Sequence, residues 1–397
     1  MARLTERPLR YHFSGLAGAG MNPLAQLMRA RGHAVQGSDR SFDQGKGAAL
    51  AARLAGLGIV VKPQDGSAIT AGLDRFVYST AVEAETPEVR AARAHGIERI
   101  PRPALLAEVV DAGRPGVAIA GTSGKSTITG MVGWLTREAG LAATVLGGAA
   151  LAGEGGSSCF LLGAASGPVA ARTYGVAPGA DARLEIVSVG PHRAAGVLHT
   201  TGGPLALDVP QPGRHNLENG AAAALIALDL GLAPATVTGL LARFPGVARR
   251  FEVVAVTPSG IRVVDDYAHN GEKLRAAITT AQAGADRVLA VFQPHGFGPA
   301  RFLRPELAEM MPRLLRSQDR LCYAEIFYAG GTVARDMSSR VLAEDLPPAM
   351  ECGYAPDHRA VVAWARERAR PGDTVLVMGA RDPELPALAR AVAADLP

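Results

Sequence analysis

Residues 121–127 form a glycine-rich loop followed by a lysine and two hydroxyl side chains, GTSGKST. We expect a strand over Val117–Ala120 before the loop and a helix over Ser126–Ala139 after it. In such a loop the backbone N–H groups and the helix N-terminus face an anion, and glycine lets the backbone approach it closely. Lys125 would add positive charge at the β- and γ-phosphates of a nucleotide, while a following hydroxyl would ligate Mg²⁺. The segment therefore predicts a nucleoside triphosphate site.

The spacing of this loop departs from the usual G-x-x-x-x-G-K-[ST] pattern, because Ile119 holds the position of the first glycine. The alternative is a structural strand–helix turn that happens to contain Gly-Lys. A strand, a loop, a Lys-Ser-Thr triplet and a helix in register favour the nucleotide site.

A second glycine-rich turn, Gly15–Met21, follows a strand expected over residues 9–14 and precedes a helix expected from Asn22 to Arg31. This turn suits a pyrophosphate at a helix N-terminus. Ala17 replaces the second glycine of the dinucleotide fingerprint, while Asp39 lies where an NAD enzyme places its ribose-binding acid. An NAD(P)-linked oxidoreductase and a turn that binds nothing are therefore both alternatives.

The elements that position these loops are short apolar strands alternating with Ala- and Leu-rich helices, as in βαβ units around parallel sheets. We expect an α/β protein with three domains, at about 1–113, 114–249 and 250–397. Turn-rich residues 113–116 suit a linker, whereas residues 147–180 show no clear period.

The composition excludes several other classes. The chain has 397 residues, of which 48% are hydrophobic and 20% charged, so disorder is excluded. The net charge of +4 is too small to indicate a nucleic-acid-binding surface. The three cysteines lie far apart in the sequence, which excludes a disulfide framework or a cysteine-rich zinc site. We expect no signal peptide, no membrane span and a cytoplasmic protein.

Four motifs, in order along the chain, resemble those of the Mur ligases. They are GTSGKST (121–127), RHNLENGA (214–221), RRFE (249–252) and DDYAHN (265–270). The resemblance implies a three-domain architecture with a Rossmann-like N-terminal domain, a P-loop central domain and a Rossmann-like C-terminal domain. The implied cofactors are ATP and Mg²⁺. The implied ATP contacts are Gly121, Thr122, Ser123, Gly124, Lys125, Ser126, Thr127, Asn216, Asn219, Arg250, Asp266 and His269, and Ser126 and Thr127 are the metal candidates.

The N-terminal turn resembles the UDP-binding loop of the branch that joins alanine to UDP-N-acetylmuramate. The implied contacts to the UDP-substrate are Gly15, Ala17, Gly18, Ala19, Gly20, Met21, Ser38, Asp39, Ser79 and Thr80. In the last domain, residues 292–295 and Arg301 resemble the branch's F-Q-P-H…R segment, so Lys125, His295 and Arg301 are the catalytic candidates. We interpret His12, His33, His95, His192, His199 and His358 as structural or surface histidines.

The resemblance implies an ATP-dependent ligase that joins an amino acid, alanine, to a UDP-N-acetylmuramate-type carboxylate through an acyl phosphate, in peptidoglycan biosynthesis or recycling.

One block of the family pattern is missing. The family carries an acidic cluster, a T-N-x-x-x-D-H segment and usually a carbamylated lysine, whereas Glu154 is the single acidic residue between Leu141 and Ala180. Either the printed chain omits an internal stretch, or this is a shortened member. A non-catalytic paralogue that binds nucleotide or UDP-sugar is therefore the alternative, and the oligomeric state stays open.

Overall fold

A computed structural model describes residues 7–79, 85–112, 116–121, 123–141, 143–153, 159–161, 173–177, 179–328 and 334–397. The chain forms two compact units, which are described separately below. The first consists of Met1–Val187, Ala195–Val209 and His215–Pro245, and the second of Ser188–Ala194, Pro210–Arg214 and Gly246–Pro397. Within the described residues, none of the helices is long and apolar enough to cross a bilayer.

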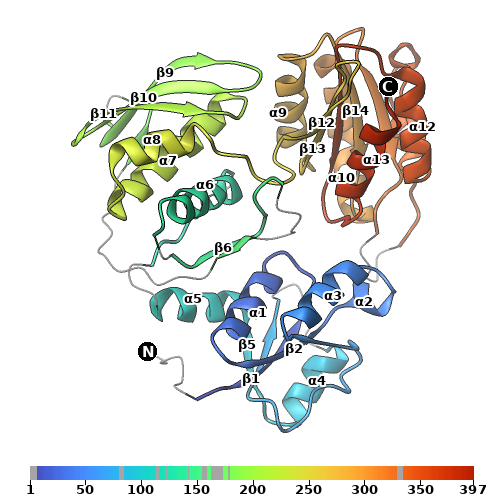
Figure 1. Cartoon of the computed structure of the whole chain (residues 1–397). Helices are drawn as coiled ribbons and strands as arrows, with labels where there is room; N and C mark the ends of the chain where they lie inside the picture. The colour runs from blue at the N-terminus through green and yellow to red at the C-terminus, as the bar shows by residue number, and fades with distance from the viewer. Residues whose placement is uncertain are drawn as a thin grey trace. The chain divides into compact units, whose positions relative to one another are not determined.

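The first unit begins with a five-stranded parallel sheet in the order β3-β2-β1-β4-β5 (Figure 1). Its strands are β1 (Arg10–Ser14), β2 (Ala34–Ser38), β3 (Val60–Lys62), β4 (Arg75–Tyr78) and β5 (Glu98–Pro101). Its helices are α1 (Met21–Ala30), α2 (Arg40–Asp43), α3 (Ala48–Gly56), α4 (Pro87–Ala94) and α5 (Arg102–Ala112). Tyr11, Phe13 and Leu27 are fully buried in its core. The strand and helix expected around Gly15–Met21 are confirmed.

The strand expected over Val117–Ala120 is wrong, because residues 116–120 form no strand in the structure. The helix after the loop is confirmed as α6 (Lys125–Glu138). None of the described strands pairs with Val117–Ala120, and the side chains of this segment are half-buried or exposed. A parallel strand needs a hydrogen-bonded neighbour, so an apolar pattern by itself does not form one.

The rest of the first unit contains a small two-stranded ladder and a four-stranded sheet ordered β11-β10-β9-β8. The strands are β6 (Val145–Gly147), β7 (Cys159–Leu161), β8 (Tyr174–Gly175), β9 (Ala182–Val189), β10 (Ala194–Thr200) and β11 (Gly203–Val209). Helices α7 (Arg214–Asp229) and α8 (Pro234–Leu241) lie along one face of β9–β11 (Figure 1). The indole N–H of Trp134 donates to the Leu240 carbonyl at 2.9 Å and joins α6 to α8.

The second unit is built on a six-stranded sheet ordered β12-β13-β17-β14-β15-β16, parallel except for β12. The strands are β12 (Glu252–Val256), β13 (Arg262–Asp266), β14 (Arg287–Gln293), β15 (Arg320–Ala324), β16 (Gly353–Ala355) and β17 (Asp373–Gly379). Helices cover both faces (Figure 1): α9 (Gly271–Gln282), α10 (Phe297–Leu314) and α11 (Arg340–Glu344) on one side, with α12 (His358–Arg368) and α13 (Leu385–Asp395) on the other. A 3₁₀ turn, η1, covers Pro348–Met350.

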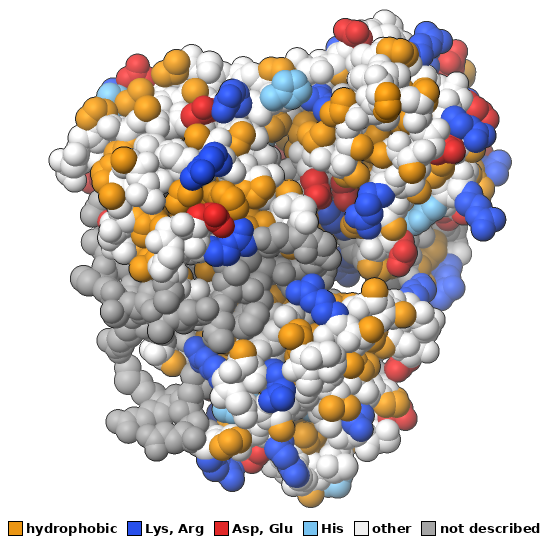
Figure 2. Space-filling view, in the orientation of Figure 1, with side chains coloured by type: hydrophobic (Ala, Val, Ile, Leu, Met, Phe, Trp, Pro, Cys, Tyr) orange, Lys and Arg blue, Asp and Glu red, His pale blue; other side chains and the backbone are white. Residues whose placement is uncertain are grey.

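The expected domain boundary near 249–250 lies beside Gly246, where the long segment of the second unit begins. The boundary expected near 113–114 falls inside the first unit, so that division stays a prediction. On the face drawn in Figure 2, basic and acidic side chains are interspersed over the described surface. The mixed surface agrees with the small net charge of +4.

Candidate substrate and nucleotide sites

The turn Gly15–Met21 is held by the end of the neighbouring strand β2. The N–H groups of Gly15 and Leu16 both donate to the Ser38 carbonyl at 2.9 Å, and Gly15 has a φ of +83°. The Ala17 N–H donates to Asp39 Oδ2 at 2.9 Å, while Asp39 Oδ1 accepts from Ser41 N at 2.9 Å. Both carboxylate oxygens of Asp39 are thus engaged within the turn.

The exposed part of this turn is the backbone of Gly18, Ala19 and Gly20, just before α1 begins at Met21. The Arg102 guanidinium lies against Gly20, with Nη1 3.1 Å from where a Cβ would stand, so a cation flanks the exposed backbone. The Gly18 N–H donates to the Gly15 carbonyl at 3.0 Å. The N–H groups of Ala19 and Gly20, together with the helix N-terminus and Arg102, suit a phosphate.

The other residues expected at the UDP-substrate differ in their surroundings. Met21 and Ser38 are buried, at 3% and 0% exposure, so their side chains belong to the interior. Ser79 is half-buried after β4, and Thr80 lies outside the described residues. Their contacts with a substrate remain predictions.

The second glycine-rich loop is packed against the start of α7. Gly121 and Gly124 have φ values of +148° and +76°, which side-chain-bearing residues rarely adopt. The Asn219 carboxamide oxygen lies so close to Gly124 that no side chain would fit there, and Asn219 donates to Asn216 Oδ1 at 3.4 Å. The structure therefore brings two of the expected motifs together.

The side chains of this loop differ in exposure. The Lys125 ammonium is exposed and donates to the Gly121 carbonyl, so it lies over its own loop. Ser126 is half-buried, Thr127 is 8% exposed and Ser123 is exposed. Thr122 lies outside the described residues.

In the second unit, the carboxyl ends of β13, β14 and β17 gather His269, His295 and Arg381 at one edge of the sheet. The rings of His269 and His295 meet edge to face with centroids 5.6 Å apart. The His269 Nδ1–H donates to the Tyr267 carbonyl at 2.8 Å, which leaves Nε2 as an acceptor. Arg381 has a φ of +65°, in the left-handed region. Strained backbone and clustered basic groups are features of ligand sites.

Burial and neighbouring positive charge keep both imidazoles neutral. Burial, Arg381 and His269 together lower the pKa of His295 to about 4. Burial is also the main cause of the lowered pKa of His269, while Lys273, Arg250 and Arg381 add to it. Neutral imidazoles bind ligands without adding charge of their own.

The segment before this edge is fixed by Arg249, Arg250 and the carboxylates of β13. Both guanidinium groups lie over the Tyr267 ring, 4.9 and 5.1 Å from its centroid, and Arg249 donates to the Gly379 carbonyl at 2.8 Å. Asp266 accepts from the N–H groups of Phe251 and Ala268, both at 2.7 Å. Its carboxylate therefore shapes the segment, and direct contact with ATP remains a prediction.

Sequence reasoning missed His358, interpreted as structural or surface. The structure places its Nε2 3.4 Å from Asp382 and 3.3 Å from Gln293 Nε2, at the same sheet edge. The hydrogen bond that His358 donates to Asp382 raises the pKa of His358. Only the pairing of α12 with this edge reveals the contact, because His358 lies far from the motifs in sequence. Arg301, on α10, forms an exposed ion pair with Asp336. The catalytic role of Arg301 remains a prediction.

Among the described residues, no three His, Cys, Asp or Glu side chains gather in a way that could hold a metal ion. For Mg²⁺, the first unit offers the hydroxyls of Ser126 and Thr127 beside Lys125. A hydroxyl next to nucleotide phosphates suits Mg²⁺, which keeps several waters and uses substrate oxygens.

Comparisons with known proteins agree with this geometry. A model of the Mur ligase family catalytic domain matches residues 10–114, and a model of the Mur ligase glutamate ligase domain matches residues 249–381. Among solved structures, a UDP-N-acetylmuramate-alanine ligase from Thermotoga maritima has a TM-score of 0.76 at 20% identity, covering 97% of this chain and 98% of that one. A murein peptide ligase from Psychrobacter arcticus has a TM-score of 0.64 at 18% identity, covering 97% and 99%. These neighbours share the fold.

Curated relatives are similar over nearly their whole length. A UDP-N-acetylmuramate–L-alanine ligase of Kineococcus radiotolerans is 31% identical, over 94% of this chain and 93% of the relative. One from Arthrobacter sp. is 34% identical, over 90% of each chain. The Kineococcus alignment spans 453 positions, more than the 397 residues here, so that relative has residues without a counterpart. These identities and the two matched family models show that the chain belongs to the Mur ligase family.

Proposed function

We propose that this protein is an ATP-dependent ligase that joins alanine to UDP-N-acetylmuramate or a related muramyl carboxylate, in peptidoglycan biosynthesis or recycling. The observation that carries the proposal is that the Asn219 carboxamide lies against Gly124 and donates to Asn216, so two of the motifs that we assign to a nucleotide site are in contact. Relatives named as such ligases at about 30% identity support it.

Each part of the chain would have its own task. Residues 1–113 would hold the UDP-sugar at the exposed backbone of Gly18–Gly20, and residues 114–249 would hold ATP. Residues 250–397 would bring the amino acid. The substrate carboxylate would attack the γ-phosphorus, ADP would leave, and the amine would displace phosphate from the acyl phosphate. Lys125 would stabilise the charge on the transferring phosphoryl group.

Mg²⁺, when bound with ATP, neutralises phosphate charge during such a transfer. Ser126 or Thr127 would supply its protein ligand. His295, Arg301 and His269 would contact the nucleotide or the incoming amino acid, with neutral imidazoles accepting hydrogen bonds. A cytoplasmic location agrees with the intracellular source of ATP that the reaction requires.

A non-catalytic paralogue is the second candidate. The apolar run at 117–120 has no strand partner among the described residues, and the acidic cluster of the family is missing from the sequence. Such a protein would bind ATP or a UDP-sugar without releasing phosphate.

The test measures phosphate release from ATP with UDP-N-acetylmuramate and each amino acid in turn. We expect release with alanine, and a loss of about 100-fold or more in Lys125→Ala, because one preorganised charge contact is worth that much. Lys46→Ala, an exposed lysine of the same unit, is the control and should keep the wild-type rate. ATP binding without release for any amino acid would favour the paralogue, and release unaffected by Lys125→Ala would contradict the ATP site.

A further inference from the structure

A carboxylate is buried beneath the turn proposed to receive the UDP-substrate. Glu88 lies in the first turn of α4 and is 1% exposed. Its Oε1 accepts from His12 Nε2 at 2.9 Å and from the Ser38 hydroxyl, while Oε2 accepts from the Ser14 hydroxyl at 2.5 Å. His12, Ser14 and Ser38 are themselves at most 1% exposed. The sequence motifs contain Ser38 but give no reason to single out Glu88 or His12.

The tautomer of His12 follows from its second neighbour. The Gln36 amide nitrogen lies 3.2 Å from His12 Nδ1 and donates to the Ala68 carbonyl at 2.9 Å. The Ala68 carbonyl fixes this nitrogen as a donor, so Nδ1 must accept and the ring proton lies on Nε2. His12 is then neutral and donates to Glu88, and the carboxylate carries the full negative charge.

Hydrogen bonds keep that charge in place. Burial acts to raise the pKa of Glu88, but the hydrogen bonds from His12, Ser14 and Ser38 outweigh it and the pKa is lowered. The position of Glu88 near the N-terminus of α4 also favours a negative charge. The carboxylate is thus an ionised acceptor for three neutral donors.

These donors include the last residues of two strands. Ser14 ends β1 and Ser38 ends β2, and the two are paired in register. The Ser38 carbonyl also accepts the N–H groups of Gly15 and Leu16. One carboxylate therefore fixes the end of β1, from which the glycine-rich turn starts, and the end of β2, which holds that turn.

We propose that Glu88, supported by neutral His12, is a positioning residue for the UDP-substrate site, because its carboxylate fixes Ser14, Ser38 and through them the turn Gly15–Gly20. This inference rests on the proposed function. Both serine hydroxyls give their protons to Glu88, so neither donates to a phosphate oxygen. The phosphate is left to the backbone N–H groups of Ala19 and Gly20 and to Arg102, since the Gly18 N–H donates to the Gly15 carbonyl.

The first test compares Glu88→Gln with wild type in the ligase assay. Glutamine has nearly the same volume as glutamate, but its NH₂ group would face the donors that now bind the carboxylate. We therefore expect the KM for UDP-N-acetylmuramate to rise about tenfold. The kcat and the KM for ATP should stay within about twofold. Ser14→Ala, a smaller change, should raise the same KM about threefold and keeps the test valid if Glu88→Gln fails to fold.

The matched control is Glu98→Gln, in the same sheet. Glu98 pairs with Arg75 Nε at 2.9 Å, and Arg75 retains Glu108 at 2.7 Å when Glu98 is removed. Glu98→Gln should leave both KM values unchanged. A fall in kcat without a change in KM for Glu88→Gln, or equal effects in Glu98→Gln, would overturn the positioning role.

A second measurement does not depend on turnover. In ¹⁵N-histidine NMR of the full chain, we expect the His12 ring proton on Nε2 with Nδ1 as an acceptor, and a proton on Nδ1 would overturn the inference. Calorimetric titration with UDP-N-acetylmuramate separates the two proposals. If wild type fails to bind, the proposed function fails and the positioning role with it. If wild type and Glu88→Gln bind equally, the positioning role alone fails.

Discussion

The two edges of the six-stranded sheet in the second unit carry polar residues of opposite kinds. At the amino edge, where β14, β15 and β17 begin, acids and arginines are paired and saturated with hydrogen bonds. At the carboxyl edge, where β13, β14 and β17 end, basic groups lie beside one another on strained backbone. The difference separates polar residues that hold the fold from those available to a ligand.

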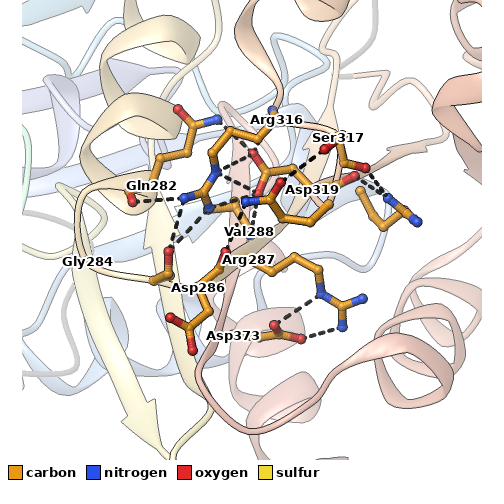
Figure 3. Close-up of polar contacts among 12 residues, drawn as sticks. Gln282, Gly284, Asp286, Arg287, Val288, Arg316, Ser317, Asp319 and Asp373 are labelled. Carbon is orange, nitrogen blue, oxygen red and sulfur yellow. Dashed lines mark hydrogen bonds and ion pairs between the residues drawn. The ribbon is translucent and has the colours of Figure 1, made fainter.

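The amino edge is centred on Asp319 and Arg316 (Figure 3). Asp319 is 4% exposed and accepts from Val288 N at 2.8 Å, Gln282 Nε2 at 2.8 Å and the Arg316 guanidinium at 2.9 Å. Arg316 also donates to the carbonyls of Gln282 and Ala285, both at 3.3 Å, at the end of α9. Despite burial, these hydrogen bonds lower the pKa of Asp319. These contacts hold the starts of β14 and β15 and the end of α9 together.

A second pair completes this edge. Arg287, the first residue of β14, donates to both oxygens of Asp373, the first residue of β17, at 3.1 and 2.6 Å. Asp373 also accepts from Arg370 N at 2.7 Å. These contacts leave little capacity for a ligand.

At the carboxyl edge Asp266 and Asp382 are also paired, but a second group of side chains there is basic throughout. His269, His295 and Arg381 meet there, and the pKa values of both histidines are lowered by burial and positive neighbours. Arg249, Phe251 and Arg381 have φ values of +59°, +52° and +65°. Because both imidazoles are neutral, the positive charge at this edge comes from the arginines, and that charge favours an anionic ligand.

The largest expected effect is at the amino edge. Asp319→Ala should lower the free energy of unfolding of the second unit by about 3–5 kcal/mol, because it leaves the Val288 N–H and the Gln282 amide without their acceptor. Urea unfolding followed by Trp364 fluorescence, in a Trp134→Phe background, measures it. Glu309→Ala, which removes an exposed pair with Arg313, is the control and should cost less than about 0.5 kcal/mol. Equal losses in both variants would remove the distinction between the edges.

The next effect is acid sensitivity at the carboxyl edge. The pKa of His295 is about 4 in the folded protein against an ordinary 6.5, so between these values the unfolded chain takes up a proton that the folded one does not. Stability should therefore fall as pH drops from 6.5 to 4. His295→Gln should remove about 1–2 kcal/mol of that loss, allowing for solvent screening.

Urea unfolding at pH 7 and pH 4.5 measures this loss. His95→Gln, at an exposed position in the first unit, should retain the full loss. A wild-type protein equally stable at both values would contradict the neutral imidazole at this edge.

The smallest effect concerns Arg381. Arg381→Gly removes the left-handed strain and a positive neighbour, so it should change stability by at most about 1 kcal/mol, in the stabilising direction. It should also raise the pKa of His295, measured by NMR titration. Arg381→Lys keeps charge and strain and should leave that pKa lowered. A pKa unchanged in Arg381→Gly would show that burial alone lowers it.

Much of the fold could be predicted from local pattern. The strand before Gly15–Met21 and the helices after both glycine-rich loops follow apolar periodicity and turn residues, and β1, α1 and α6 are confirmed. The strand over Val117–Ala120 is wrong, because its pattern is local but a strand requires a neighbour. Of the site, glycine positions were predictable, whereas the contact of His358 with Asp382 depends on how α12 packs.

The sequence by itself determined which backbone segments can approach an anion, because glycine at Gly15, Gly121 and Gly124 is a local property of the chain. It also determined the family, through motifs in a fixed order. Only the tertiary structure decided which side chains serve those segments. Glu88 reaches Ser14 and His12 because parallel strands and a helix distant in sequence pack together, and such long-range packing leaves no periodic signal in any one segment.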